Sequence, residues 1–283
     1  RDVEKFPIRR SSPMGYTARV LARREHLLPA SNHSFVVLGA HQFGAPGEGH
    51  DDPVMRSLAA TRDWAGVLLV EAAPPVAAEL RARMAASNPF PKAARVAVSN
   101  VGICPPGLLA SGASTLPFYH LAARGDGLPS WVDEVGSFSQ KLVHRQIANV
   151  ARWNSQWLRR RAAQGNAPTA RWSISRLKSS VQEAAVPCST LEAELARHKL
   201  PPPAVLIIDI EGLDCDVIEA TDWCRTRPWL VRFEHSHCHG AGRANLARAY
   251  AALHARCEPA PAWNYTTRRF PYDSFAYAAP LVS

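Results

Sequence analysis

The stretch from Phe35 to Glu71 decides how the chain folds: an apolar run FVVL (35–38), a glycine-containing turn GAHQFGAPGEG (39–49), a helical segment, and a second run GVLLVE (66–71). A short apolar run that enters a glycine turn is typical of a buried parallel strand leaving its sheet. The second run closes a β-α-β unit. Its acidic end, Glu71, can accept hydrogen bonds from both hydroxyls of a ribose, while N–H groups of the turn face the rest of a nucleoside. A strand–helix turn that binds nothing is an equally good interpretation of this stretch alone.

Length and composition predict one large domain. The 283 residues, 47% of them hydrophobic, suffice for a single core. We expect residues 1–30 to form a basic, proline-containing N-terminal extension and residues 31–283 to form the domain, with an insertion at about residues 104–185. No apolar run approaches the ~20 residues that cross a bilayer, so no membrane span is predicted. A basic chain that begins at Arg1 is compatible with a mitochondrial or plastid protein whose leader has been removed.

The cysteines are scattered, and none forms a Cys-x-x-Cys pair. The six are Cys104, Cys188, Cys215, Cys224, Cys238 and Cys257. This spacing predicts free thiols in an intracellular, reducing compartment rather than a disulfide framework.

Positive charge is concentrated in one segment. The chain carries 33 basic and 24 acidic residues, a net charge of +9, and residues 141–180 hold basic residues but no acidic one. Three tryptophans lie among them, and a basic face interleaved with aromatic rings suits RNA or another polyanion. A solvated helix is the alternative, because Val143, Ile147, Val150 and Trp157 follow a helical stripe. We favour tryptophans that face the core, and leave the arginine face open as a docking surface for RNA or a protein assembly.

Strands and helices alternate along the rest of the domain, which predicts a doubly wound α/β sheet. We expect a hairpin containing strand 115–121 at the sheet edge, followed by a basic helical segment. Further strands are expected at 94–100, 204–212, 229–234 and 273–279, and helices at 76–86, 244–255 and from 186–192, where Ser189 or Thr190 can cap.

The most apolar strand, residues 204–212, carries two acids. Asp209 and Glu211 are two residues apart, so they point the same way at the carboxyl end of the strand, where ligands of α/β proteins bind. Two unpaired acids on one buried strand are costly, so they should meet a ligand, a cation or each other's proton.

Several phrases together resemble one family, the FkbM-type S-adenosylmethionine-dependent methyltransferases. The likeness runs from about Ser31 to Ala278. The phrases that carry it are Gly39-Ala40-His41 with Gly44, GVLLVEAAP (66–74), STLE (189–192), IDIEG (208–212) and FEH (233–235).

The resemblance implies a mostly parallel, seven-stranded class I methyltransferase sheet that transfers the methyl group of S-adenosylmethionine to a hydroxyl oxygen of a small molecule or glycan. In that picture the glycine turn lines the methionine side of the cofactor, Glu71 holds the ribose, and Ser99 or Asn100 lies near the adenine. The implied cofactor-binding residues are Gly39, Ala40, His41, Gly44, Glu71, Ser99, Asn100 and Asp209. The implied catalytic residues are Asp209, Glu211 and His235, with His237 as a further candidate base.

The chain departs from the family pattern in its first motif. The family usually has an acid where this chain has Val37, and an asparagine where it has His41. Loss of that acid could weaken cofactor binding by ~1–3 kcal/mol. A degenerate methyltransferase fold that serves as a structural subunit, docked through its basic segment onto RNA or a large, organellar assembly, is therefore the alternative function.

Histidines crowd together after the strand at 229–234. In an extended segment His235, His237 and His239 would share one side, and with Asp209 they could form a metal site. A polar rim of the pocket is the interpretation we prefer, so no metal is predicted.

Overall fold

The structure is a computed structural model of the chain, and it describes residues 30–41, 43, 53–110, 112, 114–121, 135–149, 174–238, 243–255, 265–270 and 273–278. The strands are β1 (Ser34–Leu38), β2 (Gly66–Val70), β3 (Val96–Ser99), β4 (Gly102–Ile103), β5 (Thr115–Leu121), β6 (Gly136–Ser137), β7 (Val181–Ser189), β8 (Pro203–Ile208), β9 (Leu230–Glu234), β10 (Tyr265–Arg269) and β11 (Asp273–Ala278). Residues 1–29 of the predicted extension lie outside the described part.

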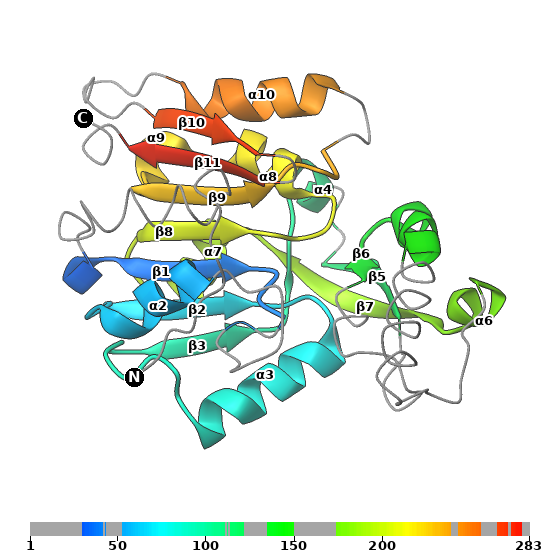
Figure 1. Ribbon diagram of the computed structural model, residues 1–283, viewed down its shortest axis with the longest axis horizontal. Helices are drawn as coiled ribbons and strands as arrows, with labels where there is room; N and C mark the ends of the chain where they lie inside the picture. The colour runs from blue at the N-terminus through cyan, green and yellow to red at the C-terminus, as the bar shows by residue number, and fades with distance from the viewer. Residues whose placement is uncertain are drawn as a thin grey trace, which may run out of the picture.

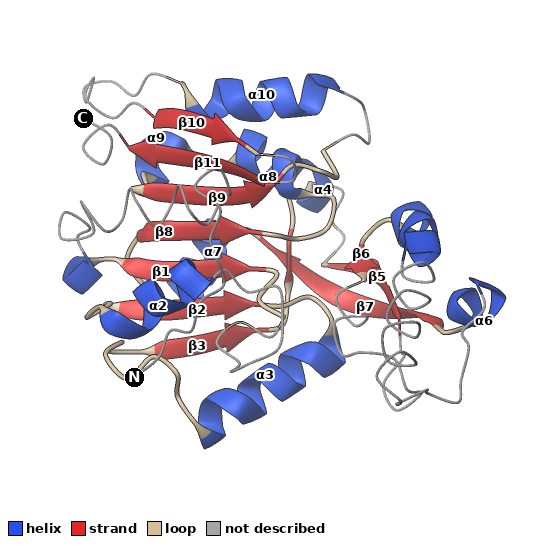
Figure 2. Ribbon diagram, viewed as in Figure 1, coloured by secondary structure: helices blue, strands red, loops and turns tan. Residues whose placement is uncertain are grey.

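Helices alternate with these strands (Figures 1 and 2). They are η2 (Ala30–Asn32), α2 (Pro53–Thr61), α3 (Pro74–Ala86), α4 (Pro106–Leu109), α6 (Ile174–Ser179), α7 (Leu191–Arg197), α8 (Asp214–Ala220), α9 (Trp223–Thr226) and α10 (Arg243–Leu253), and residues 140–149 are also helical. As predicted, Thr190 caps α7, because its side chain accepts a hydrogen bond from the N–H of Ala193. No helix within the described ranges is long and apolar enough to cross a membrane.

The main sheet has seven strands in the described part of the chain, in the order β10-β11-β9-β8-β1-β2-β3. Strands β3, β2, β1, β8 and β9 pair in parallel. Strand β11 runs antiparallel to both of its neighbours, β9 and β10. The prediction of an α/β protein built on a seven-stranded sheet is confirmed, and the sheet is mixed.

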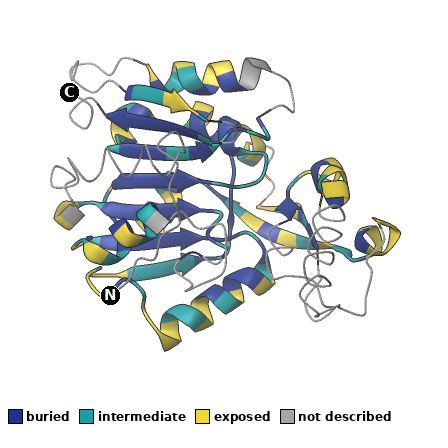
Figure 3. Ribbon diagram, viewed as in Figure 1, coloured by how far each residue is buried: buried dark blue, intermediate teal, exposed yellow. Residues whose placement is uncertain are grey.

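Both faces of this sheet are covered, and its central strands are buried, whereas the edge strands β3 and β10 are only partly buried (Figure 3). Alternate residues of a strand point to opposite faces. Val36 and Leu38 of β1 therefore pack in a cluster with residues of α7, α8 and α10, whereas Phe35 and Val37 pack with residues of α2 and with Trp64. Burying each such side chain contributes about 1.5–3 kcal/mol, so β1 lies at the centre of the core and stabilises both of its layers.

A second sheet, in the order β4-β7-β5-β6, extends from the main body (Figure 1). Strand β7 pairs antiparallel with the whole of β5, from Thr115 opposite Pro187 to Leu121 opposite Val181. Two details differ from prediction here: the expected helix begins only after its Thr190 cap, since residues 186–189 still belong to β7, and β5 belongs to a separate sheet instead of a hairpin on the main edge. The error has a local cause, because Pro187 and the weak alternation of β7 argue against a strand in sequence.

The apolar stripe of the basic segment is confirmed for the residues that the structure describes. Val143 and Ile147 are fully buried and pack with Leu121, Val135 and Leu177 under the second sheet. Residues 150–173, which hold Val150, Trp157 and the densest run of arginines, lie outside the described residues.

Disulfides replace the predicted free thiols. Cys104 bonds Cys188, with 5.8 Å between their Cα atoms, and Cys215 bonds Cys238, with 5.6 Å; Cys224 is disulfide-bonded as well. The prediction failed because the partners are 84 and 23 residues apart and meet only through the tertiary fold, which spacing in sequence cannot show.

Candidate active site

The candidate site lies where the parallel strands β1, β2, β8 and β9 end. The carboxyl ends of neighbouring parallel strands meet at one edge of a sheet, where α/β proteins bind ligands. Gly39, Glu71 and Asp209 follow β1, β2 and β8 directly, and Glu234 is the last residue of β9. The fold therefore collects Gly39, Glu71, Asp209 and Glu234 at one edge.

The turn after β1 is held by the protein itself. The N–H groups of Gly39 and Ala40 both donate to the carbonyl oxygen of Val70, at 2.9 Å each. Gly39 has a φ of 78°, and a Cβ atom on it would lie 1.7 Å from the carbonyl oxygen of Asp209. The glycine is thus required by the close approach of β8, and the N–H groups of residues 39 and 40 point into the protein, contrary to our expectation that they face a ligand.

Glu71 links the turn to β2. Its Oε2 atom accepts a hydrogen bond from the N–H of His41 (2.9 Å), and its Oε1 atom accepts one from the N–H of Ala73 (2.8 Å). Burial raises the pKa of Glu71, and the N–H groups of Ala73, His41 and Ala72 oppose this rise. A carboxylate has about four lone-pair sites, so the hydrogen bonds from His41 and Ala73 fix its position and leave it able to accept further donors.

The two departures from the family pattern have different structural settings. His41 has a φ of 35°, in the left-handed region that asparagine and histidine tolerate better than most residues, which accounts for the exchange of one for the other. Val37 is only 2% exposed and lies in the core between Leu69 and Ile207. Ala40 is buried in the same core cluster, and Gly44 lies outside the described residues.

The residues predicted beside the adenine serve different partners. The hydroxyl of Ser99 donates to Oε2 of Glu194, a fully buried residue of α7. The side-chain amide of Asn100 donates to the carbonyl oxygens of Glu71 and Ala72, at 2.9 Å each. Asn100 therefore ties the end of β3 to the end of β2 at the candidate site, whereas Ser99 faces the helix layer.

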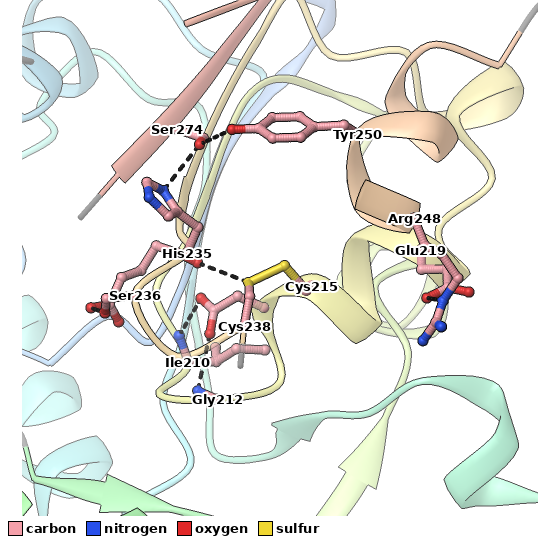
Figure 4. The surroundings of a disulfide bond; sticks show 12 residues. Ile210, Gly212, Cys215, Glu219, His235, Ser236, Cys238, Arg248, Tyr250 and Ser274 are labelled. Atoms are coloured by element: carbon pink, nitrogen blue, oxygen red, sulfur yellow. Dashed lines mark hydrogen bonds and ion pairs between the residues drawn. A yellow bond between two sulfur atoms is a disulfide. The ribbon is translucent and has the colours of Figure 1, made fainter. Parts of the chain in front are cut away.

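The turn after β8 is strained and pinned. Glu211 has a φ of 54° and Gly212 a φ of 114°, and a non-glycine residue in the left-handed region is a mark of functional sites. The carboxylate of Asp214 accepts hydrogen bonds from the N–H groups of Ile210 and Gly212, at 3.1 Å each (Figure 4). Burial raises the pKa of Asp214 to about 6, although these two backbone donors lower it.

Asp209 and Glu234 have pKa values raised well above those of ordinary carboxyl groups. Burial and the charge of Glu211 raise the pKa of Asp209 to about 8, and Arg232 opposes this rise. Burial and the charges of Asp209 and Glu211 raise the pKa of Glu234 to about 10. Four acids at one sheet edge cannot all ionise together, which is the setting in which proteins tune a carboxyl group for proton transfer.

His237 and Gln146 complete this acidic group. The Nε2 atom of His237 lies 3.2 Å from Oε2 of Glu211 and 3.6 Å from Oε1 of Glu234. Gln146, on the helix at 140–149, donates from Nε2 to the same Oε2 atom of Glu211 (2.7 Å). Burial lowers the pKa of His237, but the hydrogen bond and charge of Glu211 outweigh it, and the net pKa is raised.

His235 occupies a different place from His237. It is 1% exposed, its Nδ1 atom lies 3.1 Å from Oγ of Ser274, and Arg269 donates to its Nε2 atom (3.2 Å). Ser274 in turn bonds the hydroxyl of Tyr250 (Figure 4). Both ring nitrogens of His235 are therefore engaged within the core, whereas His237 faces the acids; His239 lies outside the described residues.

The disulfide Cys215–Cys238 holds these two parts of the site together. It joins α8, which follows Glu211, to the loop that carries His237 (Figure 4). The N–H of Cys238 also donates to the carbonyl oxygen of His235 (3.2 Å). Both cysteines are at most 4% exposed, so the disulfide that connects these two loops is buried.

Sequence reasoning missed three residues of this group: Asp214, Gln146 and Glu234. Glu234 had a usable signal, because it ends a strand in the same way as the acids after β8. Asp214 and Gln146 had none, because their roles depend on a turn conformation and on a helix placed by tertiary packing.

Comparison with known proteins assigns the chain to a family. Neither a curated protein nor a solved structure matches it. The family model of the methyltransferase FkbM domain matches residues 38–258, a range that includes Glu71, Asn100, Asp209, Glu211 and His237. The chain therefore belongs to the FkbM methyltransferase domain family, as its motifs predicted.

Proposed function

We propose that this protein transfers the methyl group of S-adenosylmethionine to a hydroxyl oxygen. The observation that carries the proposal is the meeting, at one sheet edge, of the Glu71 turn and the acids Asp209 and Glu211 in a chain of the FkbM family. A small molecule or a glycan is the acceptor class that we propose.

A class I methyltransferase fold is part of this proposal. Five consecutive parallel strands, β3-β2-β1-β8-β9, with helix-lined cores on both faces and a reversed β11 beside β9, support a doubly wound, mostly parallel arrangement. In such a sheet the cofactor lies across the ends of the central strands.

Glu71 and Asn100 are the residues that best fit the cofactor. Glu71 has lone-pair sites left for the ribose hydroxyls, and its position is fixed by backbone donors on both sides. Asn100 sits beside it at the end of β3 and leaves its side-chain oxygen for an adenine amino group. The cofactor supplies an electrophilic methyl group on a positively charged sulfur.

Asp209 is the best candidate for the base. An acceptor hydroxyl becomes a better nucleophile as its proton passes to a carboxylate oxygen, and such a base is most effective when its pKa is close to the working pH. The pKa of Asp209, raised to about 8, meets that condition. Glu211 is already bonded by Gln146 and His237, so it positions the turn and keeps the pKa of Asp209 high.

The structural-subunit alternative rests on the departure at Val37 and on the basic segment 141–180. Four basic residues of that segment are described and exposed, Lys141, Arg145, Arg176 and Lys178, whereas Arg159, Arg160 and Arg161 lie outside the described part. We propose further that the protein works in an oxidising environment, where its disulfides persist. Alkylation of the native protein before and after reduction, read by mass spectrometry, tests this, and free cysteines in the native sample would refute it.

Calorimetric titration with S-adenosylmethionine tests the proposed function before any acceptor is known. Saturable binding at one site supports it. A chain that binds no cofactor but binds RNA in a salt-sensitive way would favour the structural alternative.

A further inference from the structure

Three side chains beside the proposed base converge on a single point. Glu211 comes from the turn after β8, Glu234 from the end of β9, and His237 from the loop that follows. One ligand atom from each lies within 4.8 Å of the other two. The set was not visible in sequence, where the three histidines 235, 237 and 239 suggested a different group.

The spacing of these atoms is that of ligands around a metal ion. Two ligands that each lie about 2.1 Å from one ion are about 3.0 Å apart at a right angle and about 3.4 Å apart at a tetrahedral angle. The Nε2 atom of His237 lies 3.2 Å from the Glu211 oxygen and 3.6 Å from the Glu234 oxygen. Small side-chain movements would therefore bring all three to bonding distance.

The described surroundings of the cluster are mostly acidic. Asp209 and Asp214 lie near Glu211 and Glu234, and Arg145 is a basic residue whose charge acts on His237. Arg232, whose charge acts on Asp209, is itself paired with Asp273 at 3.1 Å. The ion pairs of Glu211 and Glu234 within the described ranges are both with His237.

Glu234 provides a second, independent observation. Its Oε2 atom is buried and has no hydrogen-bond partner among the described residues, while Oε1 accepts from the hydroxyl of Ser236. A buried carboxylate oxygen without a partner is rare in folded proteins, because its lost hydration is not replaced. A cation bonded to this carboxylate would replace that hydration.

We propose that Glu211, Glu234 and His237 bind one divalent cation. Two carboxylates and an imidazole are a mixed oxygen and nitrogen set, which suits Mn²⁺, Fe²⁺ or Zn²⁺ better than the all-oxygen preference of Mg²⁺ or Ca²⁺. The Oε1 atom of Gln146 is also buried and has no hydrogen-bond partner in the part of the chain that the structure describes, and rotation of that amide would offer its oxygen as a fourth ligand. The disulfide Cys215–Cys238 connects α8, which follows the Glu211 turn, to the loop that carries His237, and so limits the movement of these two ligands. The site does not depend on the proposed methyl transfer.

Mn²⁺ is the probe for the test. Electron paramagnetic resonance of the purified, disulfide-bonded protein should show one tightly bound Mn²⁺ per chain, and pulsed measurements should show coupling to a directly bonded ¹⁴N nucleus, that of His237. Changing a residue in the surroundings of a metal typically weakens binding about 10- to 100-fold, so loss of a ligand in His237→Gln or Glu234→Gln should weaken it by at least about 100-fold.

Two matched variants control for unspecific effects. Glu219, which pairs with Arg248 on the exposed surface, and His254, which contacts Thr267, lie outside the cluster. Glu219→Gln and His254→Gln should bind Mn²⁺ as the parent does. Absence of bound Mn²⁺ and Zn²⁺ in the parent protein, binding without ¹⁴N coupling, or equal affinity in His237→Gln would each overturn the proposal. The ¹⁴N coupling is measured on the unaltered protein, so the test stands even if a variant fails to fold.

Discussion

The two halves of the site are built by different means. The half after β1 and β2 is a backbone structure, in which N–H groups of residues 39 and 40 bond Val70 and a single carboxylate, Glu71, closes the turn. The half after β8 and β9 is a side-chain structure, in which acids and His237 contact one another and a disulfide holds the loops. The first suits a fixed cradle for a cofactor, and the second suits proton transfer.

The difference has an energetic consequence. A backbone cradle tolerates changes of side chain but no added volume, because its atoms are already in contact. A cluster of acids tolerates changes of volume better than changes of charge, because each member sets the pKa of the others. Substitutions can therefore separate the two halves.

The largest effect is expected from Gly39→Ala. Its Cβ would meet the carbonyl oxygen of Asp209 at 1.7 Å in a left-handed backbone conformation. Strain and overpacking together should lower the free energy of unfolding by about 3–5 kcal/mol. Urea unfolding measures this. Gly107→Ala is the matched control, since its added Cβ meets nothing within 4 Å, and an equal loss in both variants would contradict the account.

Loss of either disulfide should lower the stability of the protein by a similar amount, but only one of the two losses should lower its activity. Replacing either pair by serine should cost about 2–4 kcal/mol of unfolding free energy. The pair Cys215 and Cys238 supports the Glu211 and His237 loops, whereas Cys104 and Cys188 join β4 to β7 away from them. Only loss of the first pair should lower turnover per folded molecule. Comparable turnover losses in both double variants would refute a specific role.

Asp214 should make stability depend on pH. Its folded pKa of about 6 exceeds the ordinary value of 3.8, so the folded chain binds this proton more tightly than the unfolded chain. The resulting stabilisation is complete below about pH 4 and is lost as the pH rises through about 6. In Asp214→Asn, the fall of unfolding free energy in this window should be shallower by about 1.4 kcal/mol per pH unit. Chemical unfolding at pH 4, 5 and 6 checks this, and parallel curves would rule it out.

Asp209→Asn should separate chemistry from binding. Loss of the base should lower turnover by about 100-fold or more, while cofactor affinity changes little. In the parent, turnover should rise with pH towards about 8, as the Asp209 carboxyl loses its proton. Turnover of candidate hydroxyl acceptors at saturating cofactor measures both. A variant as active as the parent would remove Asp209 from the reaction.

The smallest effect is expected from the basic segment. Because the sequence predicts that Arg159, Arg160 and Arg161 are solvated, reversing them to glutamate should leave stability within about 0.5 kcal/mol, the usual limit for surface substitutions. If the segment instead binds RNA, the log–log salt slope of binding should flatten by about one unit per lost phosphate contact. Fluorescence binding to mixed RNA across a salt series decides between them.

The sequence predicted those parts of the fold that depend on residues close together in the chain. The strands containing Val37, Leu69 and Ile207 were visible as apolar runs, and Glu71 and Asp209 were placed by their positions at strand ends. The second sheet was not, because β7 pairs with a strand about 65 residues earlier and carries a proline that argues against pairing. The disulfide pairings and the contact of Gln146 with Glu211 were not predicted for the same reason, since only tertiary contacts bring these residues to their partners.

The central claim is that Glu71 belongs to a cradle for S-adenosylmethionine, and calorimetric titration tests it most directly. The parent should bind one equivalent, and Glu71→Gln should bind about 10- to 150-fold more weakly, because a charged acceptor is worth about 1.5–3 kcal/mol. Glu79→Gln, on the exposed side of α3, should bind as the parent does, and thermal unfolding should show that the variants are folded. Equal affinity of the parent and Glu71→Gln, or no binding by the folded parent, would contradict the account.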